Sequence, residues 1–261
     1  MSLVVVFDVN GTLLDIHALA RPLRRIFGCR ISVEEWFTKV VQYSMAVSLA
    51  ADYFKFSEIA ITVLEMMAAG KGIRLSKAQI EKVQSAMEHL PPFPDVKPSL
   101  RKLRNAGVRL ATLTNSSPST LEAQLRNDGL HRYFEQTLSV HSVHRYKPSA
   151  ETYRFAAQSL GVDPGEILMV AAHPWDLLGA SRAGCRTAFV SRPGKALWPS
   201  ARRPDYVVDD LTELANRLVG DTFLGPPSTR GVSASRLALI GCGAALGVLG
   251  GVLFRENAKL S

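Results

Sequence analysis

The chain has 261 residues, a formal net charge of +8 and a hydrophobic content of 47%. This length and hydrophobic content are enough to build a sizeable core that needs no disulfide bonds or metal ions for stability. Its three cysteines, Cys29, Cys185 and Cys242, are scattered and odd in number, which excludes a disulfide framework and indicates a reducing compartment. The basic residues form no run and no zinc pattern, which argues against nucleic-acid binding and favours capture of small anions.

The amino end predicts a buried strand that finishes at an acid. Residues 3–7 read Leu-Val-Val-Val-Phe, and Asp8 follows directly. Such an apolar run is typical of a central parallel strand, and ligands bind at the carboxyl ends of these strands. Gly11 permits a sharp turn beside the acid. Asp8 is therefore a candidate nucleophile, with a capping aspartate as the alternative.

A helical unit is predicted next, over residues 16–94. Four stretches carry apolar residues at helical spacing: Ile16–Phe27, Val33–Ser48, Phe56–Ala69 and Lys77–His89. The unit separates the first strand from the rest of the sheet, so we expect hinges near Asp15–His17 and Pro91–Pro94.

Strands and helices then alternate. Further strands are predicted at Val108–Leu113, Ile167–Ala171 and Thr187–Val190, and helices at Val96–Ala106, Ser119–Asp128, Ala150–Leu160 and Trp175–Ala183. Ser117 and Pro118 fit a helix start, and Gly107, Gly129, Gly161 and Gly184 fit helix ends. This alternation predicts an α/β fold with a doubly wound parallel sheet, whose polar clusters share one edge.

Four motifs in order give a family resemblance. They are Asp8-Val9-Asn10-Gly11-Thr12, then Thr114 in Thr-Asn-Ser-Ser-Pro, then Lys147 in Tyr-Lys-Pro, then Asp176 after Trp175. The chain resembles the haloacid dehalogenase superfamily, and within it the 2-haloacid dehalogenase type II branch. The resemblance implies a Rossmann-like core of residues 1–15 and 95–220, with residues 16–94 as a helical cap that closes over the site.

The same resemblance implies a hydrolase that cleaves carbon–halide bonds. Asp8 would attack a short (S)-2-haloacid to form an ester, which water converts to a 2-hydroxyacid. Thr12 would hold Asp8, and Lys147 and Asp176 would complete the catalytic set. The residues expected to contact substrate are Asn10, Thr114, Asn115, Phe37, Tyr43 and His173. For His173, a water-orienting base and a buried structural histidine are both open.

Two departures from the branch stand out. Phe37 occupies the place of the halide-binding arginine after Trp36, and Ala171 and His173 occupy the places of residues that handle water. The cap cations that could substitute for that arginine are Lys39, Arg21, Arg24 and Arg25.

Asn10 separates dehalogenation from phosphate hydrolysis. Phosphatases of the superfamily carry at that position an acid that protonates the leaving alcohol, and an amide has no such proton. Ala172 stands where they usually place a further acid, so only Asp8 and Asp176 could hold a metal. We therefore expect no cofactor. The alternatives are a Mg²⁺-dependent phosphatase acting on a small metabolite, and a membrane-tethered binding protein on a decayed hydrolase scaffold.

The carboxyl end carries a separate prediction. Residues 221–235 are rich in Gly, Pro, Ser and Thr and predict a flexible linker. Residues 236–255 contain eighteen uncharged residues, Leu237–Phe254, between two arginines, which favours a transmembrane anchor. A helix docked on another protein and a poorly ordered extension are the alternatives. No signal peptide is evident, so we expect a cytoplasmic catalytic domain on the membrane, with homodimerisation open.

Overall fold

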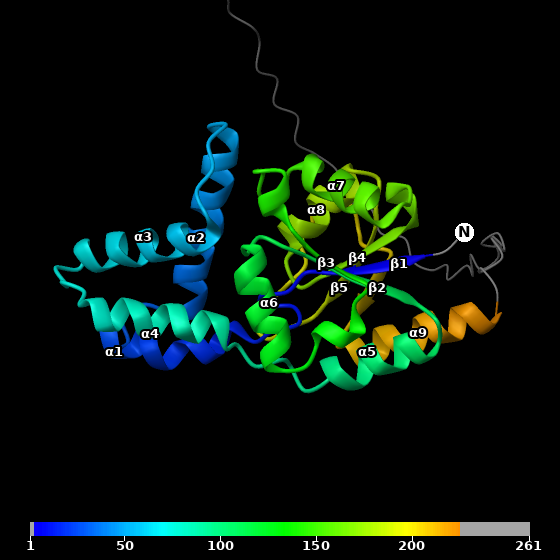
Figure 1. Ribbon diagram of the computed structural model, residues 1–261, viewed down its shortest axis with the longest axis horizontal. Coiled ribbons are helices and arrows are strands. Elements are labelled where there is room, and N and C mark those ends of the chain that lie inside the picture. Colours follow the sequence, from blue (N-terminus) through cyan, green and yellow to red (C-terminus); the bar gives the residue numbers. More distant parts are fainter. Residues whose placement is uncertain (1–2, 225–261) are drawn as a thin grey trace, which may run out of the picture. The chain divides into compact units, whose positions relative to one another are not determined.

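The computed structural model describes residues 3–224, and its centre is a six-stranded parallel sheet (Figure 1). The strands lie in the order β3-β2-β1-β4-β5-β6. Their bounds are β1 (Val4–Phe7), β2 (Arg109–Thr114), β3 (Gln136–Ser139), β4 (Ile167–Ala171), β5 (Arg186–Val190) and β6 (Tyr206–Val208). The predicted parallel α/β fold is confirmed.

β1 is a central strand, since it pairs with β2 on one side and β4 on the other, and every one of its side chains is buried. Phe7 pairs in register with Thr112 of β2 and with Val170 of β4. The backbone N–H of Asp8 still donates to the Val170 carbonyl, at 2.9 Å, before the chain leaves the sheet. The carboxyl ends of three neighbouring strands therefore meet at one edge, and Asp8 stands in the middle of it.

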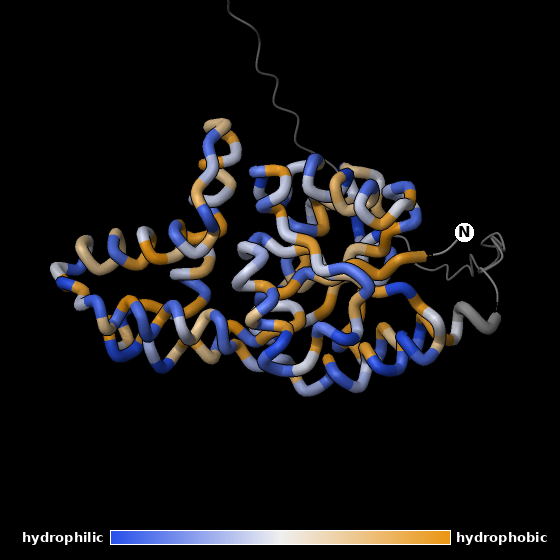
Figure 2. Tube along the Cα trace, viewed as in Figure 1, coloured by the Kyte–Doolittle hydropathy of each residue, from blue (hydrophilic) through white to orange (hydrophobic). Residues whose placement is uncertain are grey.

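Helices cover both faces of the sheet. In Figure 1, α7 (Ala150–Leu160) and α8 (Pro174–Arg182) lie above it, while α5 (Val96–Asn105) and α9 (Leu211–Leu224) lie together below it. Figure 2 shows that hydrophobic residues concentrate on the strands between these layers. α6 (Pro118–Asn127) packs near β3 and begins as predicted, since Ser117 accepts a hydrogen bond from the Thr120 N–H.

The insert between β1 and α5 is entirely helical. It contains the short 3₁₀ helix η1 (Ile16–Leu19) and the helices α1 (Ala20–Phe27), α2 (Val33–Leu49), α3 (Phe56–Ala69) and α4 (Lys77–Glu88). The two segments that connect it to the core are hydrogen-bonded to each other: the Asp15 N–H donates to the Pro91 carbonyl at 2.8 Å, and the Phe93 N–H donates to the Leu13 carbonyl at 3.0 Å. These segments coincide with the predicted hinges.

The structure corrects three predictions. The helix expected over Ile16–Phe27 is divided into η1 and α1. The strands β3 and β6 were not predicted: both are short edge strands, β3 has only one apolar residue in Gln-Thr-Leu-Ser, and the apolar Tyr-Val-Val of β6 is only three residues long. α9 continues to Leu224, four residues into the stretch predicted as linker.

The predicted transmembrane segment does not lie within the residues that the structure describes. No helix within residues 3–224 combines the length and the apolar character that crossing a bilayer requires. The candidate segment 236–255 lies outside the described residues, as does the predicted linker beyond Leu224.

Candidate active site

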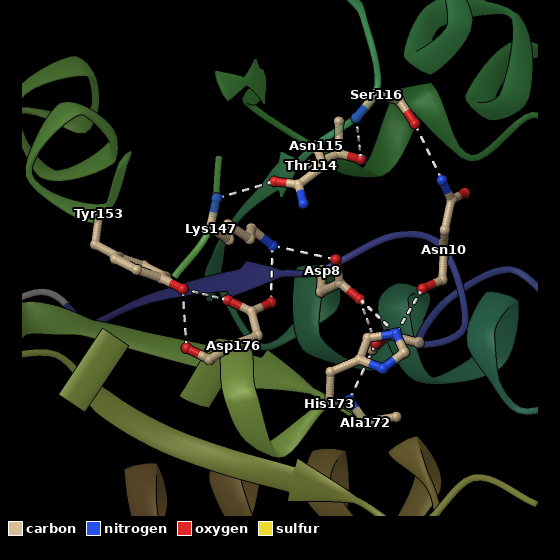
Figure 3. Close-up of polar contacts among 11 residues, drawn as sticks. Asp8, Asn10, Thr114, Asn115, Ser116, Lys147, Tyr153, Ala172, His173 and Asp176 are labelled. Carbon is tan, nitrogen blue, oxygen red and sulfur yellow. Dashed lines mark hydrogen bonds and ion pairs between the residues drawn. The ribbon is translucent and has the colours of Figure 1, made fainter. Parts of the chain in front are cut away.

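Asp8, Lys147 and Asp176, which come from three separate parts of the chain, meet at the edge beside β1 (Figure 3), and Thr12 joins them from the turn after Asp8. The Thr12 hydroxyl donates to Asp8 Oδ2 at 2.6 Å. The Lys147 ammonium donates to Asp8 Oδ1 at 3.1 Å and to Asp176 Oδ2 at 2.8 Å. All four side chains are buried. The structure therefore brings together the whole set of residues predicted to be catalytic.

The two carboxylates share one ammonium and yet differ in acidity. Burial alone would raise the pKa of Asp8, but the charges of Lys147 and His173 outweigh it and lower that pKa. For Asp176, burial prevails over the attraction of Lys147, and its pKa is raised. Burial disfavours the charged Lys147, but the two acids outweigh it and raise the lysine pKa. Asp8 is thus the carboxylate held ionised, and Asp176 is the stronger base.

Tyr153 of α7 supports Asp176 and escaped the sequence analysis. Its hydroxyl donates to Asp176 Oδ1 at 2.6 Å and lies 2.9 Å from the Asp176 carbonyl. It is buried inside a helix whose spacing identifies it only as a core residue. The sole sequence signal would have been its place six residues after Lys147.

The end of β2 supplies hydrogen-bond donors. The Asn115 carbonyl Oδ1 accepts the Lys147 backbone N–H at 3.2 Å, which turns the amide nitrogen of Asn115 toward Asp8 (Figure 3). Thr114 Oγ1 accepts the Ser116 N–H at 3.2 Å and keeps its own proton for another acceptor. Both residues line the cavity beside Asp8. This arrangement suits an anion.

Asn10 is held at both ends of its amide. Its Nδ2 donates to Ser116 Oγ at 3.0 Å, and its Oδ1 accepts from Gln124 Nε2 at 3.1 Å. Gln124 lies on α6, donates also to the Met87 carbonyl, and was not anticipated from the sequence. Asn10 is therefore a fixed wall of the site without an exchangeable acidic proton.

His173 is buried between two aromatic rings. It stacks on Phe37 at 5.8 Å and on Trp175 at 5.2 Å between ring centroids. Its Nε2 lies 2.9 Å from the Asn10 carbonyl and 3.7 Å from Asp8 Oδ2. Since a carbonyl only accepts, Nε2 carries the proton, and the nitrogen nearest Asp8 is a donor in this arrangement. Burial lowers the His173 pKa against the opposing attraction of Asp8. The geometry favours the satisfied structural histidine over the base.

Gly11 is required by its close neighbour. Its φ is +80°, and a Cβ added there would lie 2.9 Å from His173 Nε2. The turn after Asp8 and the placement of the His173 ring are thus mutually dependent.

The cavity at Asp8 is small and aromatic. Its volume is about 10 Å³, the space of a single water molecule, and the insert closes it with Phe37, Val41 and Phe56. The predicted contact Phe37 is therefore placed at the site. Tyr43 is not: it is half-exposed and lines a different, apolar cleft with Phe54 and Met66.

None of the cap cations considered from the sequence lines this cavity. Arg21, Arg24 and Arg25 line a separate surface cleft beside His17. Lys39 belongs to neither. The rings that line the cavity belong to Phe37, Phe56, His173 and Trp175.

The donor set does not suit Mg²⁺. The Lys147 ammonium bridges Asp8 and Asp176, so a divalent cation between these two acids would be repelled by its positive charge. Residue 172 is alanine and supplies no further carboxylate ligand. Among residues 3–224, no group of three or more His, Cys, Asp or Glu side chains is arranged to hold a metal ion.

The chain matches known proteins along most of its length. The family model for haloacid dehalogenase-like hydrolases matches residues 3–184. The (S)-2-haloacid dehalogenase of Pseudomonas sp. (strain YL) is 33% identical over 210 residues, which cover 79% of this chain and 90% of that protein. Haloacetate dehalogenase H-2 of Moraxella sp. (strain B) is 31% identical, over 78% of this chain and 92% of that protein.

A solved structure agrees. The L-2-haloacid dehalogenase of Xanthobacter autotrophicus, with chloropropionic acid covalently bound, superposes with a TM-score of 0.77. It is 27% identical and covers 84% of this chain and 99% of that one.

Proposed function

Because the chain belongs to the haloacid dehalogenase-like hydrolase family, we propose that it hydrolyses short (S)-2-haloacids to 2-hydroxyacids through an ester on Asp8. One observation carries the proposal. Asp8 is kept ionised by Thr12 and Lys147, next to an Asn10 whose amide is engaged on both sides. The site thus offers a carboxylate nucleophile and no acid for a leaving alcohol.

The first step is displacement at carbon. An Asp8 oxygen forms a bond to the α-carbon, opposite the halogen, and the halide departs with the bonding electrons. No proton is needed, so Asn10 is no obstacle. The chloropropionic acid covalently bound in the Xanthobacter autotrophicus relative supports an ester at this stage. The aromatic wall formed with Phe37 excludes water while the halide leaves.

The second step is hydrolysis of the ester. Water attacks the carboxyl carbon of Asp8 and gives a proton to a base. The bond from that carbon to the oxygen that first attacked breaks, and this oxygen takes the proton back from the base and leaves as the hydroxyl of the 2-hydroxyacid. The second water proton is released to solvent as Asp8 returns to a carboxylate. We assign the base to Asp176, because its raised pKa makes it the better proton acceptor of the two carboxylates. Lys147 and Tyr153 hold Asp176 in place, and Lys147 stabilises negative charge developing on Asp8.

The substrate carboxylate is bound at the end of β2. The amide of Asn115 and the hydroxyl of Thr114 point donors into the cavity. The amino end of α6, which starts at Pro118 and has its first N–H group at Ser119, adds a partial positive charge nearby.

We propose that the chain divides into a core and a cap with separate tasks. Residues 1–15 and 95–220 form the core that carries the reacting groups, and residues 16–94 form the cap that encloses them. Magnesium-dependent phosphatase activity is the weaker alternative, because the Lys147 bridge and Asn10 both oppose it. Membrane attachment and self-association stay predictions from the sequence.

Halide release tests the proposal. Purified protein is assayed with both enantiomers of 2-chloropropionate and 2-bromopropionate, with and without a chelator. The phosphatase substrate p-nitrophenyl phosphate is tested in parallel. We expect chelator-resistant halide release from the (S) acids only, and its loss in Asp8→Asn. Phosphatase activity that needs Mg²⁺, without halide release, would overturn the proposal.

A further inference from the structure

Aromatic rings from the cap and the core form one continuous row along their junction. From the active site outward, the rings belong to Trp175, His173, Phe37, Phe56, Tyr146, Tyr53 and His144, with successive centroids 5.2, 5.8, 6.4, 5.9, 5.5 and 4.4 Å apart. Phe37, Phe56 and Tyr53 come from the cap, and the others from the core. The row begins at the cavity and ends at the loop before Lys147.

Tyr53 occupies the outer end of the row. Its ring is inserted between Tyr146, at an interplanar angle of 18°, and His144, at 25°. Its hydroxyl shares a hydrogen bond with His141 Nδ1 at 2.9 Å. Tyr53 lies in the loop between α2 and α3, so a cap residue is held on three sides by one core loop.

The same cap segment binds the backbone of that loop. The Tyr146 N–H donates to Ser48 Oγ at 2.8 Å, and the Tyr146 hydroxyl donates to the Phe54 carbonyl. Tyr146 is the residue before Lys147, and the backbone N–H of Lys147 donates a hydrogen bond to Asn115 Oδ1. Cap residues 48–54 therefore fix the chain immediately ahead of the lysine that bridges the two catalytic acids.

A cavity of about 10 Å³ cannot contain a haloacid of five or more heavy atoms, so groups around it must shift to admit substrate. Movement of the cap would take Tyr53 out of its slot and deprive Tyr146 of its cap partners.

We propose that Tyr53 is a positioning residue: by docking between His144 and Tyr146 it closes the cap and at the same time places Lys147 against Asp8 and Asp176. The effect on turnover rests on the proposed function. The effect on the loop does not, because it follows from the contacts alone.

Two Tyr53 variants and a matched control test this role. Tyr53→Ala removes the ring, and Tyr53→Phe keeps the ring but loses the hydrogen bond to His141. Leu49→Ala is the control, since Leu49 ends α2 beside the same loop with 88% of its surface exposed. We expect kcat for (S)-2-chloropropionate to fall about tenfold or more in Tyr53→Ala, with KM changed less than about threefold, because a shifted Lys147 weakens the transition state more than substrate binding. Tyr53→Phe should lose about two- to threefold, and Leu49→Ala nothing.

Hydrogen exchange of the peptide spanning residues 141–148 supplies a readout that does not depend on activity. It should be faster in Tyr53→Ala and unchanged in Leu49→Ala. If Tyr53→Ala fails to fold, Ser48→Ala replaces it, because it removes only the acceptor of the Tyr146 N–H and should also speed exchange there.

Unchanged exchange together with unchanged kcat would overturn the positioning role. A wild-type protein that releases no halide would instead contradict the proposed function, and the exchange comparison would still decide the role of Tyr53.

Discussion

Asp8 and Asp176 show how one lysine can serve two carboxylates with different tasks. Both acids are buried and both contact the Lys147 ammonium, yet the pKa of Asp8 is lowered and that of Asp176 is raised. Asp8 has further support from the Thr12 hydroxyl, which donates to its Oδ2. A difference in acidity of this kind separates nucleophile from base within one site.

His173 makes stability depend on pH. Burial lowers its pKa below the 6.5 expected in the unfolded chain, so unfolded protein binds the proton first as the pH falls. The stabilisation from the neutral ring is present above about pH 6.5 and is lost as the pH drops through the lowered folded pKa. Thermal unfolding between pH 7.5 and about 5 should show a steeper fall in Tm for wild type than for His173→Gln. The exposed His131→Gln serves as control and should follow wild type; parallel curves for all three proteins would contradict this role of burial.

Single residues were predictable where a motif and a strand end coincide. Asp8 meets that condition, and Thr12, Lys147 and Asp176 were predictable from their motifs alone, since they lie in the segments that follow β1, β3 and β4. The structure gathers all four. Tyr43 does not line the site, because it lies seven residues after Trp36, outside the cavity, where it is 39% exposed. Phe37 and Val41, four residues apart on α2, share the face toward the cavity. Gln124 and Tyr153 were missed because helical spacing marks both only as core.

The packing of α8 against the lysine loop depends on one glycine. A Cβ on Gly179 would lie 2.5 Å from the Pro148 carbonyl oxygen and 2.6 Å from its Cβ, so the loop carrying Lys147 would have to move. Gly179→Ala should lower kcat about 100-fold and stability by about 1–3 kcal/mol. Gly165→Ala is the matched control, since its nearest contact would be 3.9 Å away. Steady-state kinetics and denaturant unfolding measure the two effects, and an active Gly179→Ala would show that the loop tolerates displacement.

Helices and central strands followed from the sequence, and edge strands did not. Phe56–Ala69, Ala150–Leu160 and Ile167–Ala171 have the predicted bounds because apolar periodicity and end signals agree there. β3 and β6 are recognisable only through their neighbours, since each is short and pairs on one side.

Cap closure is a property that no local pattern encodes. The order of strand, insert and alternating units predicted a core and a helical insert, but the small cavity and the aromatic row arise from residues distant in the chain, such as Phe37 with His173 and Tyr53 with Tyr146. The net charge of +8 is likewise a property of the whole molecule, and it attracts anionic substrates toward the protein.

The covalent ester is tested most directly by a single turnover in ¹⁸O-water. Enzyme in molar excess is mixed with (S)-2-chloropropionate. The masses of two species are then measured by mass spectrometry: the proteolytic peptide that contains Asp8, and the released hydroxyacid. Attack of water on the ester carbonyl predicts one heavy oxygen in Asp8 and unlabelled product. Heavy oxygen in the product and none in Asp8 would contradict the mechanism, since water would then have attacked the α-carbon itself.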